Sequence, residues 1–131
     1  MKHLVTRCPL AGGIFRRTVS NVHAVEDVSF NIRMGQTLSL VGESGCGKST
    51  VGRSLLRLVE PYSGQVIISG KDVLKMSPQE LRAARSDMQM VFQDPFASLD
   101  PQMLLADQVA EPMTNFGTHM GSELQDRVDL L

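Results

Sequence analysis

The residues best suited to chemistry form one continuous stretch, residues 42–50, with the sequence GESGCGKST. It fits the pattern G-x-x-x-x-G-K-[ST] at every fixed position. The glycines let the backbone curl tightly and approach a ligand without a Cβ in the way. The loop would then present a row of N–H donors, next to the partial positive charge at a helix N-terminus. The stretch therefore predicts a phosphate-binding loop, rather than a Gly/Ser-rich turn that happens to carry a lysine.

The chemistry of each position predicts its role. We expect Lys48 to contact the β- and γ-phosphates, Ser49 to ligate Mg²⁺ and Thr50 to donate to the α-phosphate. The backbone N–H groups of residues 45–48 would cradle the β-phosphate. The predicted nucleotide-binding residues are Gly42, Ser44, Gly45, Cys46, Gly47, Lys48, Ser49 and Thr50.

The elements on either side must position this loop. The apolar, β-rich run of residues 37–41 predicts a buried parallel strand leading into it. Residues 51–59 predict a helix leading out, which Pro61 stops. Its expected core residues are Val51, Leu55, Leu58 and Val59.

Upstream, residues 1–10 are expected to form a short edge strand or a frayed end, and residues 11–17 a loop. Residues 22–32 alternate in period two, which predicts a half-buried strand. A turn at residues 34–36 would then lead to the strand before the loop. The expected inward face of the alternating strand is Val22, Ala24, Val28, Phe30 and Ile32.

Downstream, residues 65–69 predict a short strand followed by a turn, and residues 88–92 a buried strand. Ser77, Pro78 and Glu80 form a capping box that should open a helix over residues 78–85. Residues 103–113 predict another helix, residues 114–121 a linker, and a second capping box at Ser122 should open the last helix.

Composition excludes several classes. At 131 residues there is room for one modest domain or part of a larger one, and the net charge of −1 does not favour nucleic acid. No apolar run approaches the roughly 20 residues that span a bilayer. Cys8 and Cys46 do not make a disulfide framework, which favours a reduced, cytoplasmic setting.

A second candidate is Gln93, which follows the predicted strand 88–92 in the sequence VFQDP. From there it could reach the γ-phosphate and help to position Mg²⁺ and the attacking water. From spacing alone, two interpretations are equally supported: this catalytic and metal-binding role, and a structural role in which the glutamine bonds to a turn.

The motifs in combination resemble the first half of the nucleotide-binding domain of an ABC transporter, most closely the ATPases of dipeptide, oligopeptide and glutathione importers. The resemblance rests on HAVEDVSF at residues 23–30, LVGESGCGKST at residues 40–50 and MVFQDPFASLDP at residues 90–101. It implies an α/β P-loop NTPase fold of ABC type with an N-terminal antiparallel β part. Residues 42–50 would be the Walker A loop and Gln93 the Q-loop glutamine.

The same resemblance implies a division into an N-terminal edge and loop (1–21), a β part and RecA-like part (22–93) and the start of a helical subdomain (94–131). It implies ATP and Mg²⁺ as cofactors, and membrane permease subunits and a second ATPase subunit as partners. The location would be the cytoplasmic face of the inner membrane. The family stacks an aromatic residue on adenine; spacing places that residue near Val19, and Phe15 is the aromatic alternative.

The family's signature Leu-Ser-Gly-Gly-Gln, Walker B carboxylates and switch histidine do not occur in these 131 residues. We therefore expect an incomplete ATPase domain that binds nucleotide without useful turnover by itself. Two alternatives stay open. One is a non-catalytic nucleotide- or partner-binding fragment, and the other, less favoured, is a small P-loop kinase.

Overall fold

The computed structural model describes residues 1–12, 17–94 and 98–130. The chain divides into two compact units, Met1–Arg85 and Ser86–Leu131, and each is described by itself. The first unit contains the phosphate-binding motif, and the second contains Gln93.

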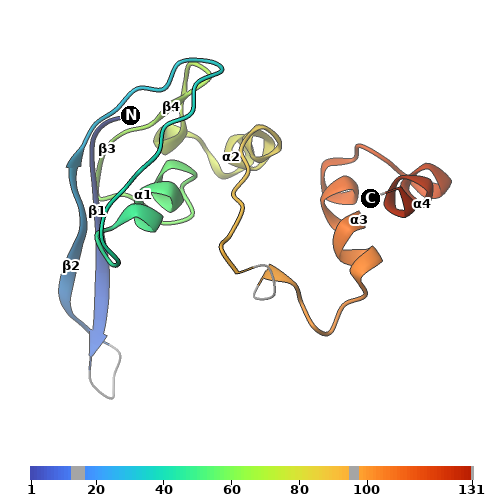
Figure 1. Ribbon diagram of the computed structural model, residues 1–131, viewed down its shortest axis with the longest axis horizontal. Helices are drawn as coiled ribbons and strands as arrows, with labels where there is room; N and C mark the ends of the chain where they lie inside the picture. The colour runs from blue at the N-terminus through green and yellow to red at the C-terminus, as the bar shows by residue number, and fades with distance from the viewer. Residues whose placement is uncertain (13–16, 95–97, 131) are drawn as a thin grey trace. The chain divides into compact units, whose positions relative to one another are not determined.

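The first unit is built on a three-stranded antiparallel sheet of β1 (Lys2–Gly12), β2 (Arg17–Val28) and β3 (Ser63–Gln65). The strand order is β2-β1-β3, so β1 lies in the centre (Figure 1). The expectation of an edge strand or frayed end at residues 1–10 was wrong, because both edges of β1 are paired. Of the expected loop at residues 11–17, residues 11 and 12 belong to β1 and Arg17 to β2, and residues 13–16 lie outside the described residues.

The pairing of β1 with β2 has three register shifts, and two of them fall within residues 22–28. Leu4 pairs with Val28 and Thr6 with Val25, and the next residue, Arg7, pairs with His23. Each step skips one residue of β2, which reverses the inward face. The predicted alternation over residues 22–32 is therefore wrong: Val25 is buried, Val22 is 45% exposed, and the strand ends at Val28.

The segment before the phosphate-binding loop differs from the prediction. Residues 33–36 form the expected turn, with Gln36 N–H donating to the Arg33 carbonyl at 3.0 Å and Gly35 at φ 75°. Residues 37–41 then run on without forming a strand, and Val41 is 93% exposed. The predicted buried strand is wrong here, because a strand needs a hydrogen-bonded neighbour and none of the described residues pairs with it.

Helix α1 (Lys48–Leu55) follows the loop, as expected, but it begins and ends earlier than predicted. The chain leaves the helix before Pro61, with Arg57 in the left-handed region at φ 52°. Of the expected core residues, Val51 is buried while Leu58 is 48% exposed. Leu58 faces solvent because the helical periodicity stops before it.

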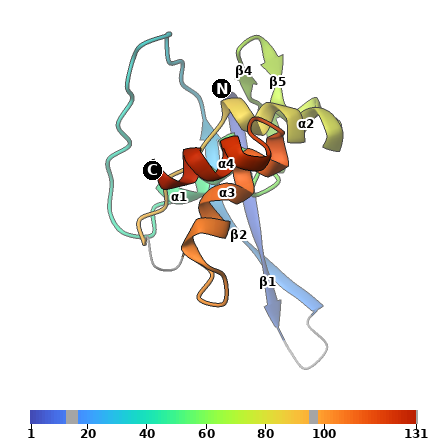
Figure 2. The same ribbon diagram turned by 90° about the vertical axis from the view of Figure 1, so that its right-hand side faces the viewer.

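The remainder of the first unit is a small hairpin and a helix. β4 (Ile67–Ile68) pairs with β5 (Lys71–Asp72) around a turn with Ser69 and Gly70 at positive φ, so the predicted strand 65–69 is divided between β3 and β4. A short 3₁₀ helix, η1 (Val73–Lys75), leads to α2 (Pro78–Ala84), and η2 (Arg85–Asp87) follows (Figure 2). The capping box at Ser77 and Glu80 is present, as predicted.

The core of the first unit is small. Its residues come from β1, β2, α1, η1 and the segment between β3 and β4. The buried apolar residues of this unit are Leu4, Val25, Val51, Val66 and Val73.

In the second unit, residues 88–92 form no strand, and Val91 is 95% exposed, so the predicted buried strand is again wrong. Helix α3 (Leu105–Phe116) starts later than expected and continues past Pro112. Helix α4 (Gly121–Asp129) begins one residue before Ser122 with no side-chain cap, so the second capping box is not formed. Among the described residues, none of the helices is both long and apolar enough to cross a membrane.

Candidate functional site

The phosphate-binding motif forms an exposed loop that joins residues 37–41 to α1. Gly45 and Gly47 have φ of 81° and 92°, a region that only glycine adopts readily. The Cys46 N–H donates to the Glu43 carbonyl at 3.3 Å, which closes a tight turn. That N–H, one of four expected to cradle a phosphate, is therefore used inside the loop in this structure.

A close backbone contact makes Gly47 necessary, whereas the close neighbour of Gly42 is a side-chain atom that can rotate away. A Cβ at Gly42 would lie 2.7 Å from Cys46 Sγ, whereas a Cβ at Gly47 would overlap the carbonyl oxygen of Ala24 on β2. The end of the loop thus lies directly against the backbone of the antiparallel sheet. Only a residue without a side chain permits this approach.

The ammonium of Lys48 folds back into the loop. Its Nζ donates to the carbonyls of Gly42 at 2.7 Å and Glu43 at 2.6 Å, and lies 3.5 Å from Cys46 Sγ. These bonds hold the start of the loop near its end. They also hold a positive charge inside the loop.

The N-terminus of α1 suits an anion. Gly47 is the N-cap residue, no side chain caps the helix, and its first turn has no acidic residue. The first N–H groups of a helix lack intrahelical partners, and the helix dipole is positive at that end. The hydroxyl of Ser49 is exposed in this turn, and Thr50 is half-buried. The residues present therefore fit a phosphate group.

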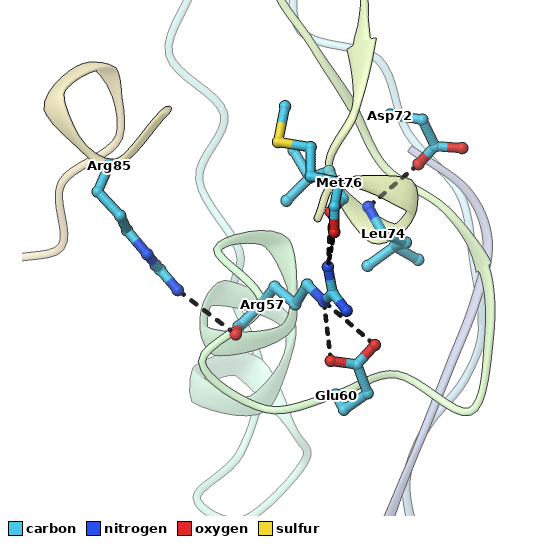
Figure 3. A network of polar contacts seen from close by, with 7 residues as sticks. Arg57, Glu60, Asp72, Leu74, Met76 and Arg85 are labelled. Atoms are coloured by element: carbon cyan, nitrogen blue, oxygen red, sulfur yellow. Dashed lines mark hydrogen bonds and ion pairs between the residues drawn. The ribbon is translucent and has the colours of Figure 1, made fainter. Parts of the chain in front are cut away.

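A polar network holds the opposite end of α1 (Figure 3). The Arg57 guanidinium donates to the carboxylate of Glu60 at 2.8 Å and to the carbonyl of Met76 at 2.7 Å. Its own carbonyl accepts a 3.5 Å bond from Arg85, at the end of α2. The network joins the end of the loop's helix to η1 and α2.

A third contact lies between these ends. The hydroxyls of Thr6 on β1 and Ser54 on α1 are 2.9 Å apart, and both residues are fully buried. Sequence reasoning missed this pair, because the residues are far apart in the chain and neither belongs to a motif. The one signal that could have identified Ser54 is a small polar residue three positions after Val51 on the helix.

Other predicted residues lie outside the loop and the first turn of α1. Gln93 is exposed in the second unit, so its predicted catalytic and metal-binding roles stay predictions, as does Mg²⁺ ligation by Ser49. Phe15 lies outside the described residues, as does the side chain of Val19. No group of three His, Cys, Asp or Glu side chains that could hold a metal occurs in residues 1–12, 17–94 and 98–130.

Comparison of the sequence with known proteins shows the family of the chain. The family described as "ABC transporter" matches residues 25–130. The chain is 51% identical over 128 residues to the glutathione import ATP-binding protein GsiA of Escherichia coli O157:H7, and 50% identical to GsiA of Shigella flexneri and Shigella sonnei. Each alignment covers 98% of this chain and 20% of the relative.

The family match includes the whole phosphate-binding loop and most of both units. The fold shows the expected antiparallel β part beside the motif, which the resemblance in sequence implied. The chain therefore belongs to the ABC transporter family and has the P-loop NTPase fold class of that family.

Proposed function

We propose that this chain binds Mg-ATP through residues 42–50, as the nucleotide-binding part of an ABC importer ATPase. The observation that carries the proposal is the Lys48 ammonium, held inside an exposed glycine loop next to the uncapped N-terminus of α1. The glycine-rich backbone, the Lys48 cation and the positive end of the α1 dipole belong to one short segment. A triphosphate is the ligand that fits this combination.

Each group in the loop has a separate task. The N–H groups at the start of α1 bind phosphate oxygens, and Lys48 neutralises charge at the β- and γ-phosphates. To reach the phosphates, the Nζ atom exchanges at least one of its carbonyl bonds in the loop for a phosphate oxygen. Ser49 supplies a hydroxyl for Mg²⁺, and the metal neutralises phosphate charge when bound.

Gln93 completes the proposal as the residue that meets the γ-phosphate. Its amide can bind Mg²⁺ through oxygen and orient the attacking water. The residues present include no acidic pair in the Walker B pattern and no signature sequence. We assign nucleotide binding to this chain, and we expect no useful ATP turnover from it alone.

The role of the whole protein follows from its relatives, of which this chain spans 20% of the length. Those relatives are named glutathione import ATP-binding proteins. On this basis the transported substrate is glutathione or a small peptide. The chain would then lie on the cytoplasmic face of the inner membrane, with permease subunits and a second ATPase subunit as partners.

The direct test is calorimetric titration of the purified chain with ATP and Mg²⁺, next to Lys48→Ala. We expect saturable binding in the wild type and at least tenfold weaker binding, on the order of 1.4 kcal/mol, in the variant. Gln93→Ala should retain most of the affinity, because the loop supplies most phosphate contacts.

Equal binding by wild type and Lys48→Ala would contradict the proposal, as would no binding by a cooperatively folded wild-type chain. Phosphate release measured in the same samples addresses turnover. Sustained release that depends on Lys48 would overturn the expectation that this chain does not hydrolyse ATP by itself.

A further inference from the structure

Three contacts position α1 on the rest of the first unit. Gly47 abuts the backbone of β2, Arg57 joins the end of the helix to η1, and Ser54 meets Thr6 in the middle. The first is a contact with backbone, and the last joins a partly buried guanidinium to a backbone carbonyl. The middle contact differs, because it joins two side chains and both residues are fully buried.

The hydroxyl pair is the directional contact in this packing. The neighbouring buried residue of α1 is Val51, whose apolar contact has no preferred direction. A hydrogen bond of 2.9 Å between buried hydroxyls does not tolerate sliding of α1 along β1, since either hydroxyl left unpaired would cost its desolvation energy. The pair therefore defines one axial position of α1 against β1.

The axial position of α1 determines where the phosphate-binding N–H groups lie. Lys48 and Ser54 belong to the same eight-residue helix, so a shift at Ser54 moves the first turn by the same amount. Thr6 also pairs directly with Val25 of β2, next to Ala24, whose carbonyl faces Gly47. The same part of the sheet thus contacts the loop at Gly47 and the helix at Ser54.

We infer that Thr6 and Ser54 are positioning residues for nucleotide binding: their hydrogen bond places the N-terminus of α1 at the distance from β2 that the phosphates require. This inference rests on the proposed nucleotide-binding function. Neither residue touches the nucleotide, and both act through the position of Lys48 and the first N–H groups of α1.

The test separates positioning from stability by using paired variants. Thr6→Val or Ser54→Ala alone leaves one buried hydroxyl unpaired, so each should lower the melting temperature. The double variant T6V/S54A removes both hydroxyls and should recover most of that loss, because apolar replacement of both partners is nearly neutral. If the pair has a positioning role, the recovered double variant still binds Mg-ATP about tenfold more weakly than wild type.

Two control variants test whether the effect on affinity comes from the buried hydroxyl pair. Thr6→Ser keeps the hydroxyl and should bind Mg-ATP within about twofold of wild type. Ser29→Ala removes an exposed hydroxyl that accepts a bond from the His3 N–H, away from α1, and should leave affinity unchanged. An affinity of T6V/S54A equal to that of wild type would overturn the inference and assign the pair to stability alone.

A second measurement keeps the inference testable if the wild-type chain binds no nucleotide, in which case the proposed function fails. Amide hydrogen exchange reports the loop directly, through the Cys46 bond to Glu43 and the Val51 bond to Gly47. At matched stability, T6V/S54A should exchange several-fold faster at these two amides. Unchanged exchange there would contradict positioning by the hydroxyl pair, whatever the chain binds.

Discussion

The two sides of the phosphate-binding loop show opposite outcomes for equally strong sequence patterns. After the loop, α1 forms and buries Val51 at 6% exposure; before it, residues 37–41 form no strand and leave Val41 at 93% exposure. The two valines lie close in sequence and have the same chemistry. Their surroundings differ because one segment closes its own hydrogen bonds and the other does not.

The two segments differ in where their backbone groups find hydrogen-bond partners. A helix satisfies its N–H and C=O groups within a few residues, so α1 and α2 form wherever their local signals are strong. A strand satisfies them on a neighbouring strand, which the local sequence does not specify. Residues 88–92 behave in the same way. Their apolar pattern is as clear as that of residues 37–41, and they too have no hydrogen-bonded neighbouring strand among the described residues.

The largest effect should come from the loop itself. Gly47→Ala would place a Cβ on the Ala24 carbonyl and force alanine to φ 92°, which should cost at least about 3 kcal/mol and abolish nucleotide binding. Chemical denaturation and calorimetry would measure both.

Gly45→Ala is the matched control, because its φ is 81° but nothing lies within 4 Å of the added Cβ. It should cost only about 1 kcal/mol. Similar losses in the two variants would show that conformation alone, and not contact with β2, makes the glycines necessary.

Substituting Val51 and Val41 compares how much the segments after and before the loop contribute to stability. Val51→Ala should destabilise the first unit by about 1–3 kcal/mol, because the side chain is buried. Val41→Ala should change stability by less than about 0.5 kcal/mol, because the side chain is exposed. Urea denaturation distinguishes them, and a large loss for Val41→Ala would mean that residues 37–41 are packed in solution.

Substitution of Arg57, just after α1, should have a smaller effect on stability. Arg57→Ala removes the donor to the Met76 carbonyl and should cost about 1–2 kcal/mol. Arg57→Gly loses the same bonds but relieves the strain of φ 52°, so it should be the more stable of the two. Thermal unfolding of both variants checks the order, and a less stable glycine variant would show that backbone strain is not significant at this position.

The smallest effect concerns pH. Hydrogen bonds from the backbone N–H and the hydroxyl of Ser77 lower the pKa of Glu80 from the ordinary 4.5. A carboxyl with a lowered folded-state pKa stabilises α2 fully above 4.5, and this contribution is lost as pH falls through the folded pKa. Glu80→Gln should reduce the acid dependence of unfolding below pH 4.5, measured by circular dichroism. An unchanged acid limb in the variant would contradict this assignment.

The sequence alone was sufficient for features that depend on neighbouring residues. The glycine-rich loop, the helix after it, the turn at Gly35 and the capping box at Ser77 were all predicted, because their glycines, caps and hydrogen bonds are local. The family resemblance followed from three short motifs, and the comparisons confirm it.

Only the tertiary structure decided which residues support the loop. The bulges in β2 put Val25 rather than Val22 inside, and the pairing of β1 on both edges brought Thr6 to Ser54. These contacts join segments far apart in the chain, and their register depends on bulges that alternation does not reveal. The local turns, helices and caps are therefore readable from local sequence, whereas the packing that supports the loop depends on long-range pairing.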